Sequence, residues 1–208
     1  MSLSAAAILL YTAPTIVMLL SAVFFKERIT PVKLAALALA FAGCCLVSGV
    51  GGGGAPLSLR GLLFGLGSGV GYALYSIFAR FALDRGYSST TVNFYSCLLA
   101  AVGAALIFGW RATFAAFTAS WPNALLCLLA GAVTCYLPYL LYTFGLTGLE
   151  TGKASILASV EPVVATLIGV FVYHESMSLV SALGVALVLS AVALLNVRMR
   201  TKTEKNIP

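Results

Sequence analysis

The sequence predicts an all-α, polytopic membrane protein, a bundle of seven transmembrane helices. Hydrophobic residues make up 61% of the chain and mean hydropathy is +1.05. Charged residues make up only 9%, whereas soluble domains carry about a quarter. The apolar stretches are also too long and too numerous for the core of a water-soluble fold. The cysteines lie inside these stretches without metal-ligand spacing, so we expect them to be packing residues, and we expect neither a metal site nor a cofactor.

Seven membrane-length segments follow one another along the chain. The first two, at about 3–25 and 32–50, are joined by a charged turn, and a glycine-rich linker at 51–58 follows them. Five more spans are predicted at 59–83, 91–110, 122–146, 152–173 and 178–197, and a basic tail, 198–208, ends the chain. Because the first span has no basic segment in front of it, we expect a retained helix rather than a cleaved signal peptide.

The chain contains an internal duplication. The stretch 6–27 recurs at 154–175: Pro14 matches Pro162 and Glu27 matches Glu175, and both differences, 162 − 14 and 175 − 27, equal 148. The ungapped match continues as far as positions 39 and 187. A proline and a glutamate that recur at one spacing are hard to obtain by chance in so apolar a chain. Internal duplication of this kind is typical of secondary transporters.

Positive charges gather on one side of the predicted topology. With seven spans the loops alternate between two sides, and ten basic residues fall on one side against two on the other. The positive-inside rule makes the richer side cytoplasmic, with the N-terminus outside and the C-terminus inside. The basic residues flank membrane spans, so they indicate no nucleic-acid partner. The richer side carries Lys26, Arg28, Lys33, Arg80, Arg85, Lys153, Arg198, Arg200, Lys202 and Lys205, and the other side carries Arg60 and Arg111.

Single-cysteine labelling tests this topology. In a background without the five native cysteines, an impermeant thiol reagent added outside should label Ser58→Cys and Thr113→Cys. It should not label Ser88→Cys or Thr203→Cys, which are predicted to face the cytoplasm. Labelling at position 203 but not at position 58 would reverse the assignment.

Glu161 is the one acidic residue predicted to lie near the bilayer midplane. It stands about nine residues, or roughly 14 Å of helix, into its span. A charge at that depth is costly, so we expect the carboxyl group to face a cavity or a partner, or to be protonated. Two hypotheses remain open. Glu161 either contacts substrate or relays protons, or its neutral form hydrogen-bonds a neighbouring helix and only fixes packing.

Polar aromatic residues inside the other spans are further candidates for a substrate cavity. Three tyrosines of the fifth span are spaced three apart on one helical stripe, where they either line a cavity or form hydrogen bonds between helices. The candidates are Tyr136, Tyr139 and Tyr142 in the fifth span, Tyr72 and Tyr75 in the third, Asn93 and Tyr95 in the fourth, and Tyr11 in the first.

Prolines, glycines and two glutamates are assigned structural roles. Pro14, Pro138 and Pro162 lie inside spans, where each leaves a carbonyl one turn earlier without its donor and permits a kink. Glu27 and Glu175 each close a span and are expected to act in the turn that starts the next helix. The glycines of the third span, at 61, 65 and 69 and at 67 and 71, recur every four residues, which favours close helix contact.

The duplicated residues resemble a known family. Ile8–Pro14 followed by Phe25–Pro31, and Ala154–Ala165 followed by Tyr173–Glu175, resemble the end of an EamA-type repeat of the drug/metabolite transporter superfamily. The segment 59–197 is similar to one whole five-helix repeat, and 1–50 to the last two helices of a first repeat. This resemblance implies ten helices in two inverted repeats around a central cavity, and alternating-access transport of a small metabolite across a bacterial inner membrane.

Against the family pattern, the chain begins inside the fourth of ten helices. We therefore expect transport to require three further helices, with protons as candidates for coupling. The alternative is a non-transporting subunit or fragment that a second copy or another partner in the bilayer completes. An enzyme is not expected. Leu66 interrupts the pattern that intramembrane serine proteases show around a serine such as Ser68, and no later span contains a histidine to act as base.

Overall fold

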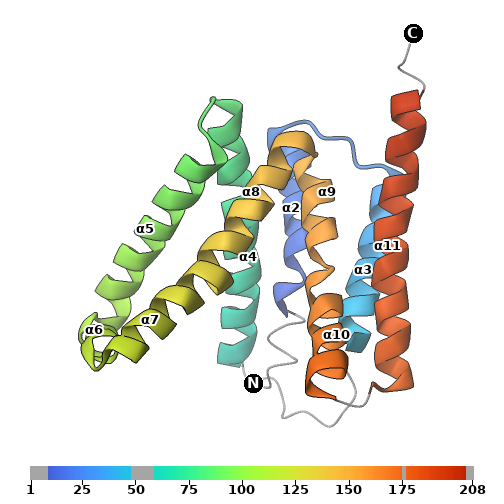
Figure 1. Cartoon of the computed structure of the whole chain (residues 1–208). Coiled ribbons are helices and arrows are strands. Elements are labelled where there is room, and N and C mark those ends of the chain that lie inside the picture. The colour runs from blue at the N-terminus through green and yellow to red at the C-terminus, as the bar shows by residue number, and fades with distance from the viewer. Residues whose placement is uncertain (1–8, 48–58, 175–176, 205–208) are drawn as a thin grey trace. The chain divides into compact units, whose positions relative to one another are not determined.

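The computed structural model describes residues 9–47, 59–174 and 177–204, and all regular elements among them are helical (Figure 1). Four helical stretches are long and apolar enough to cross a membrane, and three more are shorter apolar helices. This confirms the predicted class, a polytopic membrane helix bundle. The elements are α2 (Ala13–Phe24), α3 (Pro31–Val47), α4 (Leu59–Asp84), α5 (Ser89–Phe108), α6 (Arg111–Thr118), α7 (Trp121–Ala130), a π-helical segment η1 (Gly131–Tyr136), α8 (Leu137–Gly148), α9 (Thr151–Ala158), α10 (Glu161–Tyr173) and α11 (Leu179–Glu204).

Each predicted span overlaps one apolar helix or two or three consecutive helical elements, with shifted ends. The fourth span begins two residues earlier than expected because the Ser88 hydroxyl accepts a hydrogen bond from the Thr91 amide and caps α5. A short helix, α6, forms where the sequence suggested only a loop, and Trp110 and Phe114 stack edge to face there with ring centres 5.5 Å apart. The glycine-rich linker and Glu175 lie outside the described residues.

The chain divides into two compact units, which we describe separately. The first contains residues 1–77 and 150–208, and the second contains residues 78–149. In the first unit, α3 and α11 lie side by side and run in opposite directions (Figure 1). Their backbones meet at two glycines: a Cβ added to Gly43 would lie 2.7 Å from the Gly184 carbonyl oxygen, and the reverse distance is also 2.7 Å. This contact requires glycine on both helices.

The core of the first unit joins both halves of the duplicated sequence. Buried apolar residues of α2, α3, α9 and α11 form one cluster: Met18, Ala36, Leu37, Ala40, Ile156, Ala191 and Leu195. A second cluster joins Cys44 of α3, Val163 of α10 and Val188 of α11. Many of the residues between α3 and α11 are small, so the two helix backbones can approach closely and pack tightly.

The backbone repeats with the same offset as the sequence. Helices α2 and α10 begin at positions 13 and 161, and α3 and α11 begin at 31 and 179, so both pairs are 148 residues apart. Lys26 and His174 have the same spacing and are the two non-glycine residues of the described chain with positive φ, at 54° and 55°. Because L-residues adopt this conformation only at a cost, its recurrence shows one turn geometry built twice.

The second unit is held together by α5, η1 and α8. The Asn93 side chain of α5 is fully buried, and its Nδ2 donates to the Tyr136 carbonyl at 3.0 Å. The π-helical segment η1 ends two residues before Pro138, whose ring would clash with the carbonyl of residue 134 in a regular helix. Pro138 thus widens the fifth span into a π-turn.

Candidate functional site

Two interrupted helices define the candidate site. Helix α9 ends at Ala158 and α10 begins at Glu161, with a turn at Ser159 and Val160 between them. The first copy is interrupted at the corresponding turn, Tyr11 and Thr12, immediately before α2. The hydrogen bonds match as well: the Thr12 amide donates to the Leu9 carbonyl at 3.3 Å, and the amide of residue 160 donates to the carbonyl of residue 157 at 3.2 Å.

The prolines explain both interruptions. Pro14 and Pro162 occupy the first turns of α2 and α10, where proline is tolerated because the N–H of that position needs no helical partner. Neither proline has an N–H to donate to the carbonyl four residues earlier, which belongs to Leu10 in the first copy and to Ala158 in the second. In the second copy the expected kink is therefore a complete break between α9 and α10, and in the first copy a turn at the matching position precedes α2.

A pocket lies where the two interruptions meet. It is a half-open recess of about 30 Å³, with space for one or two water molecules. Its lining combines the predicted candidates Glu161, Tyr11 and Tyr72 with residues of both turns. Glu161 is exposed within the described chain, whereas Pro162 and Val163 behind it are buried. The lining residues are Leu10, Tyr11, Ala13, Pro14, Tyr72, Ser155, Ala158, Ser159 and Glu161.

One of the two glycine stripes of α4 brings Tyr72 to this pocket. A Cβ on Gly69 would lie 3.0 Å from the Thr12 hydroxyl and 3.1 Å from the Leu9 carbonyl, so α4 approaches the first break closely at that point. A Cβ on Gly67 or Gly71 would meet nothing within 4 Å. The sequence predicted both stripes as contact surfaces, and the described structure uses only the first.

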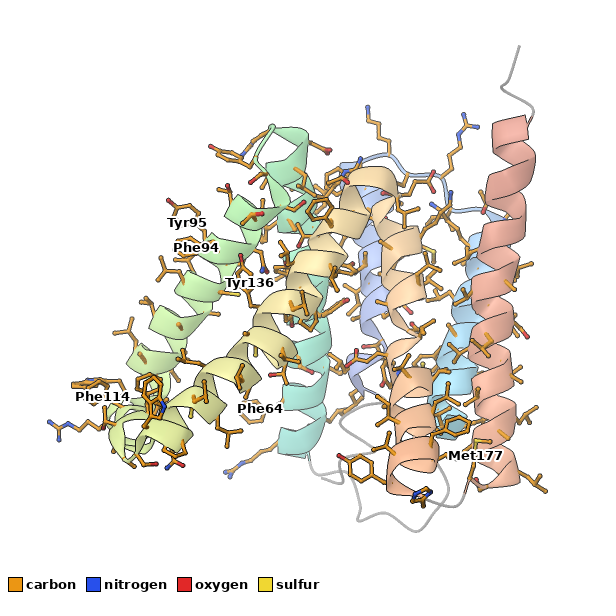
Figure 2. The ribbon with its side chains drawn as sticks, in the orientation of Figure 1. Phe64, Phe94, Tyr95, Phe114, Tyr136 and Met177 are labelled. Atoms are coloured by element: carbon orange, nitrogen blue, oxygen red, sulfur yellow. The ribbon has the colours of Figure 1, made fainter. Side chains whose placement is uncertain are left out.

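The other cavity candidates lie away from this pocket. Tyr75 is half-buried on α4, while Asn93 and Tyr136 are joined by their hydrogen bond in the second unit. Tyr95 is 58% exposed and lies on the side of α5 away from α8 (Figure 2). On α8, Tyr139 is exposed and Tyr142 is half-buried. Among the described residues, no cluster of three or more His, Cys, Asp or Glu side chains could hold a metal ion.

A network of four charges lies at one end of the first unit. The buried Lys33 ammonium group is 2.9 Å from the Glu150 carboxylate and 3.6 Å from that of Glu27. Lys153 also contacts Glu150 at 2.9 Å. We call these four residues, Glu27, Lys33, Glu150 and Lys153, the ionic cluster. It ties the turn after α2 to the start of α9 across more than a hundred residues of sequence.

Glu27 has a structural role beyond the one predicted. The sequence assigned it to the turn that starts the next helix, α3, and its carboxylate does lie 3.6 Å from the Lys33 ammonium group in the first turn of α3. Its two carboxylate oxygens also accept hydrogen bonds from the Thr151 and Gly152 amides, at 2.6 and 3.1 Å, and cap the N-terminus of α9. A carboxylate suits this position because it satisfies two unpaired amides and faces the positive end of the helix dipole.

Electrostatics in the ionic cluster favour the ionised form of Glu150. Burial raises the pKa of Glu150, but hydrogen bonds from Lys153 and Lys33 and the attraction of both ammonium groups outweigh it, so the pKa lies below its ordinary value. Sequence analysis missed Lys33 and Glu150 as interacting residues. Both residues stand beside span ends, where a charge predicts only a loop. They meet because α2 and α3 both pack against α9.

Comparison with known proteins identifies the family. The model of the EamA-like transporter family matches residues 1–49 and 59–197, which is most of the chain. The chain belongs to the EamA-like transporter family. As an EamA-like family member it is a multi-pass membrane protein of the drug/metabolite transporter type, and the resemblance of its duplicated motifs to this family is confirmed.

The relatives of this EamA-like protein are longer than the chain. An uncharacterized transporter of Archaeoglobus fulgidus is 31% identical over 189 residues, which cover 90% of this chain and 64% of the relative. The uncharacterized transporter YwfM of Bacillus subtilis is 29% identical over 183 residues, covering 86% and 59%. The chain thus spans less than two thirds of these relatives. A solved crystal structure shares the fold, with a TM-score of 0.76 at 21% identity over 97% of this chain and 69% of that one.

Proposed function

We propose that this protein is a secondary transporter of small metabolites that works by alternating access, with the pocket between the two helix breaks as its substrate site. One observation carries the proposal: two interruptions related by the internal repeat meet at a pocket that contains a carboxylate of the predicted membrane core. Interrupted helices at a repeat interface can offer unpaired backbone groups and a charged side chain to a substrate. Because these groups line a cavity, they are not exposed to lipid.

The ionic cluster supplies a gate for this mechanism. It joins the two repeat copies at one end of the first unit, the end predicted to be cytoplasmic. The repeat offset of 148 pairs Lys33 with Ser181 and Glu150 with Ser2, so the corresponding positions of the other copies lack these charges. We propose that this asymmetry keeps the cytoplasmic end closed in the resting state, because an ion pair with a buried lysine must be broken before that end opens.

A neutral variant of Glu161 tests the proposed site. In membrane vesicles, counterflow is measured with a panel of radiolabelled amino acids, amines, nucleosides and sugars. We expect Glu161→Gln to reduce counterflow of any transported compound at least about tenfold, because a hydrogen bond to a charged group contributes roughly 1.5–3 kcal/mol. Membrane abundance should stay normal, since glutamine keeps the size and hydrogen-bonding capacity of the side chain.

Glu204→Gln is the matched control, because it removes one negative charge from the last residue of α11 and should transport normally. The panel is run with the unchanged chain, Glu161→Gln and Glu204→Gln under the same conditions. Unchanged counterflow and unchanged pH dependence in Glu161→Gln would make Glu161 a packing residue and remove the proposed site.

A further inference from the structure

A larger recess lies in the second unit, where the end of α4, the start of α5 and the end of α8 meet. It is half-open and has a volume of about 290 Å³, close to the lower limit of ligand pockets, which measure roughly 300–1,000 Å³. We call it the α4–α5 recess. All of its lining residues fall between positions 78 and 149, and the transport proposal uses none of them. Its polar lining consists of Arg80, Asp84, Tyr87, Ser88, Ser89 and Thr147.

The α4–α5 recess lies at the depth of lipid head groups. Three helical stretches that are long enough to cross a membrane end at it, Leu59–Asp84, Ser89–Ile107 and Trp121–Gly148. The first has 26 residues, or about 39 Å of helix, whereas the hydrocarbon core of a bilayer is about 30 Å thick. Its end therefore extends into the head-group layer. The exposed ring of Tyr87 in the recess is typical of that layer as well.

Arg80 is held in place at the recess and has unused donors. Its Nη1 donates to the carbonyls of Leu146 and Leu149, at 2.9 and 3.0 Å, and so satisfies free carbonyls at the end of α8. Both hydrogen bonds use Nη1, so Nη2 keeps its two N–H groups as far as the described residues go. The Nε atom lies 2.9 Å from the Asp84 carboxylate, but without the alignment of a hydrogen bond. The guanidinium group can therefore still donate to an anion.

Two more polar groups of the recess have no hydrogen-bond partner in the described part of the chain. Ser89 lines the recess and is only 6% exposed, and its hydroxyl bonds to none of the described residues. Because an unpaired buried hydroxyl is costly, we expect a ligand to pair it. The Asp84 carboxylate also accepts no hydrogen bond from a described residue, and its contact with Arg80 is an ion pair alone. The recess thus offers donors for an anion and a carboxylate for a cation.

An exposed apolar stripe leads away from the recess along α8. Thr147 lines the recess, and Phe144, Leu141 and Leu137 precede it at intervals of three, three and four residues. Residues at this spacing share one face of a helix. All three apolar side chains are exposed within the described chain. An acyl chain attached to a head group in the recess would lie along this stripe, whereas a small soluble compound would leave it uncovered.

We propose that the α4–α5 recess binds the phosphoethanolamine head group of a membrane phospholipid, with an acyl chain along the apolar stripe of α8. The phosphate accepts hydrogen bonds from Nη2 of Arg80 and the Ser89 hydroxyl, and the primary ammonium group donates to Asp84. A head group without an ammonium group would leave the Asp84 carboxylate beside the phosphate charge. A trimethylammonium group has no N–H to donate. This site does not depend on the proposed transport function.

Thermal unfolding of the purified chain in detergent tests the proposal, with short-chain phospholipids that carry identical acyl chains. We expect phosphatidylethanolamine to raise the unfolding temperature in a saturable way, since a ligand of the folded state stabilises it. Phosphatidylcholine and phosphatidylglycerol should need at least about tenfold more lipid for the half-maximal shift, because each lacks the charged hydrogen bond to Asp84. Free phosphoethanolamine, which has the same head group without the chains, should also need at least about tenfold more.

Two variants test the residues and leave Arg80 unchanged, because its replacement would also remove the hydrogen bonds to the end of α8. Asp84→Asn should lose most of the preference for phosphatidylethanolamine over phosphatidylcholine, and Glu204→Gln, which removes a carboxylate from the last residue of α11, should keep it. Ser89→Ala should weaken the response to all three phospholipids. Its control is Thr90→Ala, which changes the exposed neighbour outside the recess lining and should respond like the unchanged chain.

Cross-linking of the unchanged chain gives a measurement that needs no variant. Phosphatidylethanolamine with a photoreactive diazirine in its acyl chain should label residues 137–147, and excess phosphatidylethanolamine should prevent this more effectively than phosphatidylcholine. Equal stabilisation by the three phospholipids would overturn the proposal, as would an undiminished preference in Asp84→Asn. If free phosphoethanolamine acts at the same concentration as the lipid, the recess binds a soluble phosphate compound and the lipid assignment is wrong.

Discussion

Alanine at Gly184 should lower the free energy of unfolding by about 1–3 kcal/mol, the usual cost of inserting a methyl group into a closely packed contact. The added Cβ would lie 2.7 Å from the Gly43 carbonyl oxygen and 2.9 Å from the Val47 amide nitrogen. Both are backbone atoms of α3, so no side-chain rotation can relieve the overlap. The two helices would have to move apart and lose contact along the core of the first unit. Thermal unfolding in detergent measures the effect.

Gly67→Ala is the matched control, because Gly67 also lies inside a long apolar helix but has nothing within 4 Å of an added Cβ. There the change should be neutral or stabilise by up to about 1 kcal/mol, the difference in helix propensity between the two residues. An unchanged unfolding temperature in Gly184→Ala would show that α3 and α11 do not meet at these glycines.

Replacing Lys33 with methionine should destabilise the chain by about 3–5 kcal/mol, because loss of one partner leaves buried charge without compensation. The side chain of Lys33 is 4% exposed and that of Glu27 is 10% exposed, so solvent cannot replace the lost ammonium group. Arg28→Met is the control: it removes an exposed positive charge from the same turn and should change stability by no more than about 1 kcal/mol. Thermal unfolding again supplies the measurement.

A double-mutant cycle separates the ion pair from general effects of charge. Lys33→Met combined with Glu150→Gln should cost less than the sum of the two single changes, since the two residues are in direct contact. Strict additivity would mean that the pair contributes nothing.

The dependence of fold stability on pH provides an independent check of the ionised state of Glu150. Because the pKa of Glu150 is lowered in the folded chain, its ionisation stabilises the fold at pH values above its ordinary pKa, and this contribution is lost as the pH falls through the lowered value.

Much of the candidate site could be predicted from the sequence because its determinants are local. Pro162 lacks an N–H wherever it stands, so the kink it permits follows from the sequence alone. The importance of Glu161 follows from its position in an apolar segment. The sequence was a weaker guide to the residues that share a pocket with Glu161. It offered eight other polar candidates from four spans, and of these only Tyr11 and Tyr72 line the pocket. Ser155 and Ser159 also line it, but the sequence did not single them out. Serine is common in membrane helices, so it carries no signal of its own.

The sequence by itself determined the membrane class, the spans and the 148-residue duplication, because hydrophobicity and repeat spacing are properties of the chain in order. Only the tertiary structure decided which repeated elements meet. The contact of Gly43 with Gly184, the cap that Glu27 places on α9 and the ion pair of Lys33 with Glu150 each join residues more than a hundred positions apart. No local pattern specifies such contacts, since each arises from the packing of helices whose apolar surfaces are alike in composition. For the same reason, only one of the two glycine stripes on α4 lies against the first helix break.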